Sequence, residues 1–356
     1  SVGIASIPGG ISKGNLEAVS IDVNQAVKKI KEIEPEIIDR DFATQKDLDE
    51  LLIKLDGTEN KSEIGGNTIL SISISYAKAL AKSLGIKTYQ YIHTIFNPEV
   101  PVTEVAFRQP RMMMLMLEGG KHGSGDATIQ EFMAIVENLD RGVEIYNSVK
   151  DELEKLNKST NVGAEGAFSP MGYDNEQMLS LLSGFLHGEK IALDVAASSF
   201  DEGTETPNYD SLIKNYPIAS IEDPYHETDW TNWELFGQKY TEELTVITDD
   251  ITATNPKVLR EAIKRDIGNA IIIKPNQIGT LTETLETTRI AQENGWQTVV
   301  SHRGTDTNDD FIADLAVGIG ADFTKFGAPA RGERVCKYNR LIEIGSTSDR
   351  DHPGTS

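Results

Sequence analysis

The sequence predicts an α/β protein in which a (β/α)8-type barrel, residues 101–356, follows a smaller N-terminal domain, residues 1–100. Eight short apolar runs alternate with helical patterns after Pro101. Strands that alternate with helices form a parallel sheet, and eight of them close into a barrel. An open doubly wound sheet is the structural alternative. It is expected to carry a glycine-rich phosphate turn after its first strand, and no stretch has the G-x-G-x-x-G pattern in that place.

The first hundred residues have mainly helical patterns. Apolar residues recur at helical spacing from Asp22 to Glu34, and Pro35 is expected to stop this helix. The apolar-periodic stretch from Asn67 to Ile92 is broken at Gly85, which predicts a helical pair. The motif N-P-E-V-P at Asn97 to Pro101 marks the end of this region.

The eight predicted strands are short and apolar. They occupy residues 111–117, 128–136, 190–198, 217–224, 244–250, 270–276, 298–303 and 322–327. Helical patterns follow most of them, for example from Thr231 to Tyr240 and from Asn255 to Ile267. The first run is rich in methionine, and we expect these side chains to pack in the barrel rather than to act as ligands.

Composition excludes several classes of partner. The chain has 356 residues, 34 basic against 56 acidic side chains and a formal net charge of −22, so nucleic acid and anionic membrane surfaces are not expected to bind. The single cysteine, Cys336, rules out an intramolecular disulfide and fits a reducing compartment. Because no apolar run approaches the ~20 residues of a membrane span and no signal peptide opens the chain, we expect a cytoplasmic protein.

Charged or polar residues stand at the ends of the predicted strands. They are Glu131 in the second run and then Asp194, Glu222, Asp249, Lys274, His302 and Lys325. In a barrel the C-terminal strand ends converge on one face, and catalytic residues come from that face. A charge after a single apolar run is usually just the first solvated residue. Six in succession, ordered as three acids and then three bases, favour a functional site.

These residue types indicate a metal centre that faces a cluster of cations. The three carboxylates, Asp194, Glu222 and Asp249, offer the hard oxygen ligands that Mg²⁺ prefers, whereas neither cysteine nor a paired histidine joins the set for zinc. The basic residues on the following strands, Arg303 included, predict a multiply charged anion as ligand. Burial among other cations is expected to lower the pKa of Lys274, so that it acts as a base near neutral pH.

With these residues in place, the chain resembles the enolases from its first residues to about Ile344. The resemblance is carried in family order by LDGTENKSEIGGNTILSISIS, IQEFM, IALDVAAS, SIEDP, IKPNQIGTLTETLE, FIADLAV and GAPARGERVCKYN. It implies a barrel of the enolase kind behind an α+β capping domain. It also implies Mg²⁺-dependent, reversible dehydration of 2-phosphoglycerate to phosphoenolpyruvate, with a phosphorylated small molecule as substrate and a homodimer or an assembly of dimers.

The resemblance also implies a role for each site residue. Asp194, Glu222 and Asp249 match the ligands of the tightly held Mg²⁺, and Lys274 matches the base that removes the C2 proton. Glu165 matches the acid that assists loss of the 3-hydroxyl, with Gln130 and Glu131 as its polar neighbours. His122 matches a histidine of a mobile loop, Lys325 the lysine beside the substrate carboxylate, and Ser12 a ligand of the second, substrate-assisted Mg²⁺.

His302 and Arg303 match the family's phosphate clamp, in which a guanidinium pairs bidentately with phosphate oxygens. The alternative is that Arg303 forms an ion pair with a nearby aspartate such as Asp306 or Asp309. The barrel side of this clamp departs from the family, because Gly304 stands where a phosphate-contacting serine is usual.

Other departures surround the site. Ala164, Ala167, Glu118 and Gly9 replace the family's Asp, Gly, Asn and Ser. The opening strand pair of the family is absent, and the segments after Ser20 and Phe200 are short, either because loops were lost or because the sequence joins pieces of a longer chain.

Three functions remain open from the sequence: an enolase, a related acid-sugar dehydratase, or an enolase-like binding scaffold. The phosphate clamp argues against the second. The intact acids and bases argue against the third.

Overall fold

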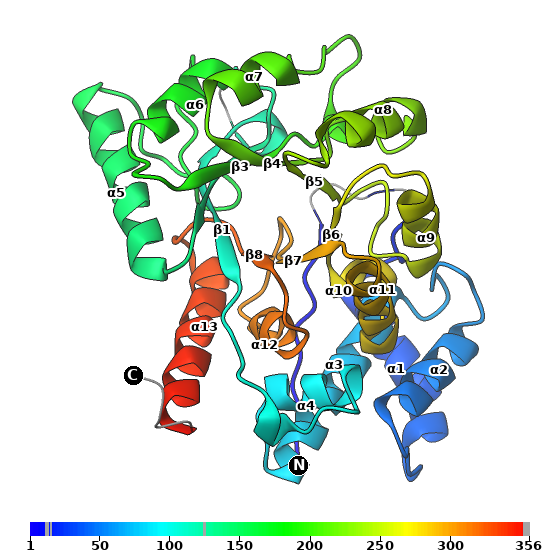
Figure 1. The fold of residues 1–356 in the computed structure, drawn as a ribbon. Helices are drawn as coiled ribbons and strands as arrows, with labels where there is room; N and C mark the ends of the chain where they lie inside the picture. Colours follow the sequence, from blue (N-terminus) through cyan, green and yellow to red (C-terminus); the bar gives the residue numbers. More distant parts are fainter. Residues whose placement is uncertain (11–13, 15, 124–125, 352–356) are drawn as a thin grey trace.

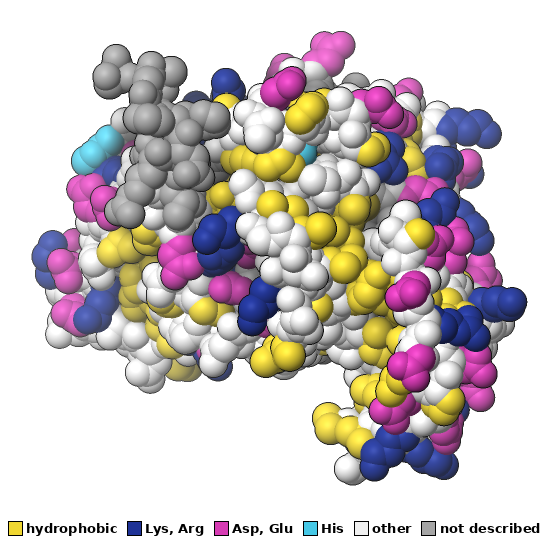
Figure 2. Space-filling model, turned by 90° about the horizontal axis from the view of Figure 1, so that it is seen from below, with side chains coloured by type: hydrophobic (Ala, Val, Ile, Leu, Met, Phe, Trp, Pro, Cys, Tyr) yellow, Lys and Arg dark blue, Asp and Glu magenta, His cyan; other side chains and the backbone are white. Residues whose placement is uncertain are grey.

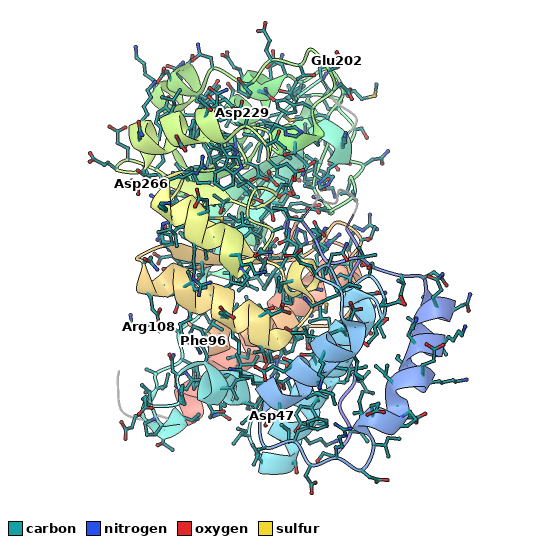
Figure 3. All side chains as sticks on the ribbon, turned by 90° about the vertical axis from the view of Figure 1, so that its right-hand side faces the viewer. Asp47, Phe96, Arg108, Glu202, Asp229 and Asp266 are labelled. Atoms are coloured by element: carbon teal, nitrogen blue, oxygen red, sulfur yellow. The ribbon has the colours of Figure 1, made fainter. Side chains whose placement is uncertain are left out.

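The computed structural model describes residues 1–10, 14, 16–123 and 126–351. Figure 1 shows a strand barrel ringed by helices, with the N-terminal helices gathered beside it. In the side view of Figure 3, Asp47 of the N-terminal region lies at the opposite end of the molecule from Glu202 and Asp229. The face seen in Figure 2 carries acidic and basic side chains interspersed, rather than a field of one sign.

Four helices form the N-terminal region: α1 (Val23–Ile37), α2 (Gln45–Asp56), α3 (Gly66–Leu84) and α4 (Thr88–Phe96). The expected break at Gly85 is confirmed, since this residue caps α3 in the left-handed conformation with φ of 71°. The expected stop before Pro35 is wrong. The helix runs to Ile37, because the proline lies in the last turn and the Ile38 N–H still bonds to the Glu34 carbonyl at 2.9 Å.

The described part of residues 1–100 contains no strand, only an isolated bridge from Gly9 to Thr305, which agrees with the absence of an opening strand pair. This helical region is tied to the barrel by ion pairs across the chain. Lys61 Nζ lies 3.0 Å from Glu283, and Lys78 Nζ lies 2.7 Å from Asp309. The N-terminal segment also contacts the barrel domain, since the Gly9 N–H donates to the Thr305 carbonyl at 3.0 Å.

Eight strands close the barrel in chain order, which confirms the predicted α/β barrel class. They are β1 (Arg111–Glu118), β2 (Glu131–Val136), β3 (Lys190–Asp194), β4 (Ile218–Glu222), β5 (Thr245–Thr248), β6 (Ala270–Ile273), β7 (Gln297–Ser301) and β8 (Phe323–Lys325). The helices around them are α5 (Leu139–Lys155), α6 (Asn175–Ser183), α7 (Tyr209–Asn215), α8 (Trp230–Tyr240), α9 (Pro256–Lys264), α10 (Pro275–Ile278), α11 (Leu281–Glu293), α12 (Phe311–Gly318) and α13 (Gly332–Asp351).

The alternating pattern predicted an all-parallel barrel, and this prediction is wrong for one strand. Strand β2 runs antiparallel to both β1 and β3, and the other neighbours are parallel. A parallel pair needs a crossover, usually an α-helix. The described residues between β1 and β2 provide only a short 3-10 turn, Gly120–His122, so β2 returns in the opposite direction. Two helices, α5 and α6, then precede β3.

The core lies inside the barrel and between the strands and the outer helices. The methionines of β1 are buried in it, from Met112 to Met116, which confirms that they pack rather than bind. Within the described chain, no single helix is long and apolar enough to span a membrane. The adjacent helices α3 and α4 reach that length and hydropathy only together, and they are bent by 103° at their junction.

Candidate active site

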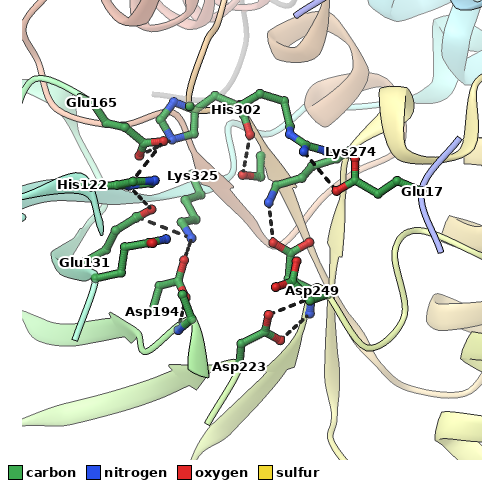
Figure 4. Close-up of a pocket in the computed structure, with 16 residues that line it drawn as sticks. Glu17, His122, Glu131, Glu165, Asp194, Asp223, Asp249, Lys274, His302 and Lys325 are labelled. Atoms are coloured by element: carbon green, nitrogen blue, oxygen red, sulfur yellow. Dashed lines mark hydrogen bonds and ion pairs between the residues drawn. The ribbon is translucent and has the colours of Figure 1, made fainter. Parts of the chain in front are cut away.

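The polar strand ends meet in one pocket at the C-terminal end of the barrel, drawn in Figure 4. Its lining includes His122, Gln130, Glu131, Glu165, Asp194, Asp249, Lys274, His302, Arg303 and Lys325, all predicted from the sequence. Glu222 lies directly beside it, within reach of the Lys325 ammonium. The predicted ligand Ser12 falls outside the described residues. Glu17, Asp223, Asp250 and Gly304 join the lining as well.

The acidic side of the pocket is built by strand register. Glu131, Asp194 and Glu222 are neighbours across β2, β3 and β4, so their side chains reach the pocket at one level. Lys325 from β8 enters among them: its Nζ lies 2.7 Å from Asp194, 2.8 Å from Glu222 and 3.4 Å from Glu131. The result is a buried cluster with more carboxylates than cations.

These carboxylates are the hard oxygen ligands that a divalent cation prefers. In the described chain, the sets whose ligand atoms lie within 4.8 Å of one another are His122, Glu131 and Glu165, and Asp223, Asp249 and Asp250, so the predicted set of Asp194, Glu222 and Asp249 is not brought that close together. Glu222 is fully buried and its Oε1 has no hydrogen-bond partner in the part of the chain that the structure describes. Burial, followed by the neighbouring Asp194, raises the pKa of Glu222 to about 8. Concentrated carboxylates raise one another's pKa in this way, and a hard cation such as Mg²⁺ relieves the repulsion.

Asp223 was missed by the sequence analysis, although it directly follows Glu222. Its two oxygens accept the backbone N–H groups of Asp249 and Asp250 at 2.9 and 3.0 Å. Together with those two residues it forms a set of potential ligands within 4.8 Å of one another. Because both of its oxygens are engaged with backbone, Asp223 orients Asp249 toward the pocket. Its own φ of 45° shows the turn that this requires.

Lys274 forms a close ion pair with Asp249, whose other oxygen accepts from Gln277 Nε2 at 2.9 Å. Burial lowers the pKa of Lys274, but the Asp249 carboxylate more than offsets it and the net direction is upward. The expectation of a lowered pKa is therefore wrong for this arrangement. The expectation counted the neighbouring cations, while the nearest charge is an anion.

On the other side of the pocket, His302 faces Glu165. His302 Nε2 lies 3.0 Å from Glu165 Oε2, and Arg334 donates to His302 Nδ1 at 2.8 Å. Arginine only donates, so Nδ1 is the acceptor and the ring proton sits on Nε2, toward Glu165. Burial lowers the pKa of His302 to about 4, so the ring is neutral near pH 7. Arg334 was not among the predicted site residues.

Two histidine rings lie near the Glu165 carboxylate. His122 Nδ1 lies 3.8 Å from Glu165 Oε1 and 3.9 Å from Glu131 Oε1. Burial raises the pKa of Glu165, but His302, His122 and Arg334 outweigh it and hold the pKa well below its usual range. Glu165 is thus predominantly ionised at neutral pH in this arrangement.

Arg303 pairs with a residue that the sequence did not indicate. Its two terminal nitrogens lie 3.0 Å from the two carboxylate oxygens of Glu17, and both side chains are buried. The suggested side-chain partners Asp306 and Asp309 are engaged elsewhere: Asp306 with Lys337 at 3.0 Å, and Asp309 with Lys78. Asp306 instead accepts the backbone N–H of Arg303.

Comparison with known proteins agrees with this geometry. The profile "Enolase, N-terminal domain" matches residues 1–92, and "Enolase, C-terminal TIM barrel domain" matches residues 106–207 and 202–350. The chain is also 36% identical over 379 aligned positions to a protein named "Enolase" from Neorickettsia sennetsu, an alignment that covers 96% of this chain and 91% of the relative. The chain belongs to the enolase family.

Proposed function

We propose that this chain is a phosphopyruvate hydratase, which reversibly dehydrates 2-phosphoglycerate to phosphoenolpyruvate in glycolysis and gluconeogenesis. The observation that carries the proposal is the meeting of Asp194, Asp249, Lys274, Arg303 and Lys325 in one pocket, with Glu222 directly beside it. An acid-sugar dehydratase does not need the phosphate-binding arginine, and a binding scaffold does not need the base.

Asp194, Glu222 and Asp249 would hold Mg²⁺, with a second, substrate-assisted ion reached from the segment that contains Ser12. When bound, Mg²⁺ supplies positive charge beside the substrate carboxylate, which becomes dianionic as the C2 proton leaves. Lys325 adds a fixed ammonium to the same region, because its Nζ lies within 3 Å of two of the carboxylates.

Lys274 is the proposed base and Glu165 the proposed acid. In this arrangement the pKa of Lys274 is raised and that of Glu165 is lowered, so Lys274 must first lose a proton and Glu165 must first gain one. They lie on opposite sides of the pocket in Figure 4, with Lys325 between them. This separation suits a reaction that takes a proton at C2 and releases hydroxide at C3. His302 Nε2 lies 3.0 Å from Glu165, and His122 and Glu131 lie near the same carboxylate. Gln130 completes the polar wall.

Arg303, with His302 beside it, is the proposed site for the substrate phosphate. Glu17 occupies the paired nitrogens of Arg303 in this structure, so phosphate binding involves an exchange or a sharing of that guanidinium. Beyond the pocket, the strongly acidic composition supports a chain that binds neither nucleic acid nor membrane surfaces. We further propose a homodimer or an assembly of dimers in the cytoplasm, from the family resemblance.

The test is the absorbance of phosphoenolpyruvate formed from 2-phosphoglycerate with Mg²⁺, and its loss with EDTA. We expect turnover that requires metal and that disappears in Lys274→Ala. No product at saturating metal and substrate would overturn the proposal and favour the binding scaffold. Turnover of acid sugars without turnover of 2-phosphoglycerate would favour the related dehydratase.

A further inference from the structure

The last residue of β1, Glu118, is a fully buried carboxylate behind the pocket wall. Its Oε1 accepts two backbone N–H groups from one loop: that of Glu165 at 3.0 Å and that of Ala167 at 2.8 Å. The two donors are Glu165 itself, the acid of the proposed reaction, and the residue two positions after it. Glu118 therefore fixes the backbone from which that acid projects.

The fit behind the loop is close. A Cβ added to Gly163 would lie 2.3 Å from Glu118 Oε2, so a side chain at residue 163 would collide with the carboxylate. Tyr146 Oη supports the same loop by donating to the Gly166 carbonyl at 2.7 Å, and the Ala328 N–H donates to the Glu165 carbonyl at 3.1 Å. Among these supports, Glu118 is the carboxyl group, and so the one that can gain or lose a charge near neutral pH.

Two departures from the pattern that the resemblance implies lie at this contact. At residue 118 the family usually has Asn, and at residue 164 it usually has Asp, whereas this chain has Glu118 and Ala164. The carboxylate next to the Glu165 loop thus comes from the end of a strand rather than from the loop itself. A strand end is a more rigid support for a charge than a turn.

We propose that Glu118 is a positioning residue for Glu165, holding the backbone of its loop and placing a second carboxylate behind it. The inference rests on the proposed function of Glu165 in loss of the 3-hydroxyl. Because Glu118 acts through Glu165, removal of the C2 proton by Lys274 on the opposite side should not depend on it. Hydrogen bonds from N–H groups to a charged acceptor are the stronger kind, so the support should tighten as Glu118 ionises.

Glu118 is expected to ionise within the pH range in which the enzyme can be assayed. Burial raises its pKa to about 8, with a smaller upward effect from Glu165. Glu165 from the loop and Tyr146 from α5 interact electrostatically with Glu118, and Glu131 of β2 lies opposite it in the strand register. Dehydration, but not proton exchange, should therefore change with pH near that value.

The experiment compares two steps in the intact protein with Mg²⁺: exchange of the C2 proton with solvent, and formation of phosphoenolpyruvate, from about pH 6 to pH 9. Glu118→Ala removes the acceptor and should slow dehydration by about ten-fold or more while exchange stays within about two-fold. Glu118→Gln keeps an acceptor oxygen, so most activity should return, but the pH dependence near pH 8 should disappear. Tyr146→Phe, the matched control, removes an uncharged support and should leave the pH profile unchanged.

Equal loss of both steps in Glu118→Ala would overturn the inference, because Glu118 would then support the pocket as a whole. A Glu118→Gln profile that superimposes on the parent's would overturn it too, and this variant decides the matter if Glu118→Ala does not fold. A failure of the proposed function is distinguishable, since the parent itself would then form no phosphoenolpyruvate.

Discussion

Arg303 and Glu17 form a buried bidentate ion pair, with both nitrogen–oxygen distances at 3.0 Å, between a strand end and a segment 286 residues earlier. Each side chain is less than a tenth exposed. A substrate phosphate and the Glu17 carboxylate would thus compete for the same guanidinium.

We expect Glu17→Gln to destabilise the protein and to strengthen its response to phosphate. Removing one partner of a buried pair leaves an uncompensated charge, which typically costs about 3 kcal/mol or more. A bound dianion would then provide the charge that Arg303 has lost. Thermal unfolding with and without inorganic phosphate measures both effects: a lower Tm for the variant, and a larger upward shift on adding phosphate.

Two controls accompany this comparison. Glu59→Gln breaks an exposed pair with Lys257 and should change neither quantity. Arg303→Ala added to Glu17→Gln should abolish the enlarged phosphate response. Equal phosphate shifts in parent and Glu17→Gln would mean that Glu17 and phosphate do not compete for Arg303.

For Lys274→Ala we expect complete loss of C2 proton exchange, with Mg²⁺ binding as tight as in the parent or tighter. Lys274 is the base in the proposed reaction, and its ammonium also pairs with Asp249, so its removal takes away a cation that competes for that carboxylate. Isotope exchange with solvent and a metal titration measure the two effects. In the matched variant Glu165→Gln, dehydration should fall more than exchange. Exchange that persists in Lys274→Ala would remove this residue from the role of base.

Two carboxylate substitutions should move stability in opposite directions in the presence of EDTA. Burial and Asp194 raise the pKa of Glu222, so its charge is unfavourable in the fold, and Glu222→Gln should raise Tm. Asp249 is buried too, but Lys274 and Lys325 lower its pKa, so Asp249→Asn should lower Tm by leaving Lys274 without its close partner. Both variants should bind Mg²⁺ more weakly. A Tm change of the same sign in both variants would contradict the view that the Glu222 charge is unfavourable and the Asp249 charge favourable in the folded protein.

The sequence predicted the chemistry of the site better than its pairings. The regular spacing of the strand ends along the sequence was enough to place Asp194, Glu222 and Lys325 on one face of the barrel, because each strand-plus-helix unit returns the chain to that face. Pairings depend on distances that no local pattern encodes. Glu17 contacts Arg303 across 286 residues of chain, and Glu118 contacts the Glu165 loop across 47 residues, so neither contact follows from a local pattern.

For the fold as well, the general class could be predicted from the sequence, while a detail that depends on the connections could not. Alternating apolar and helical runs were enough for the barrel class, but strand direction depends on what joins two strands. The turn at Gly120–His122 does not resemble a crossover helix, and that signal was available in the sequence before β2. The pKa of Lys274 was misjudged for a further reason, because the sign of its shift is set by whichever charge lies nearest, here Asp249.

The protein should lose stability through His302 as the pH falls from about 6.5 to about 4. The ordinary histidine pKa is 6.5, and burial, with the nearby Arg334 adding to it, lowers that of His302 to about 4. Between these values the unfolded chain binds a proton that the folded chain does not, so the free energy of unfolding decreases as the pH drops. The contribution amounts to roughly 3 kcal/mol between pH 7 and pH 4.

Urea unfolding at a series of pH values measures the dependence of the unfolding free energy on pH in the parent and in His302→Gln, where the slope should be shallower. The exposed His187, changed to Gln, should leave the slope as it is in the parent. If His302→Gln has the parent's slope, the ring already titrates normally in the folded protein, and the neutral histidine is not the form that persists at neutral pH.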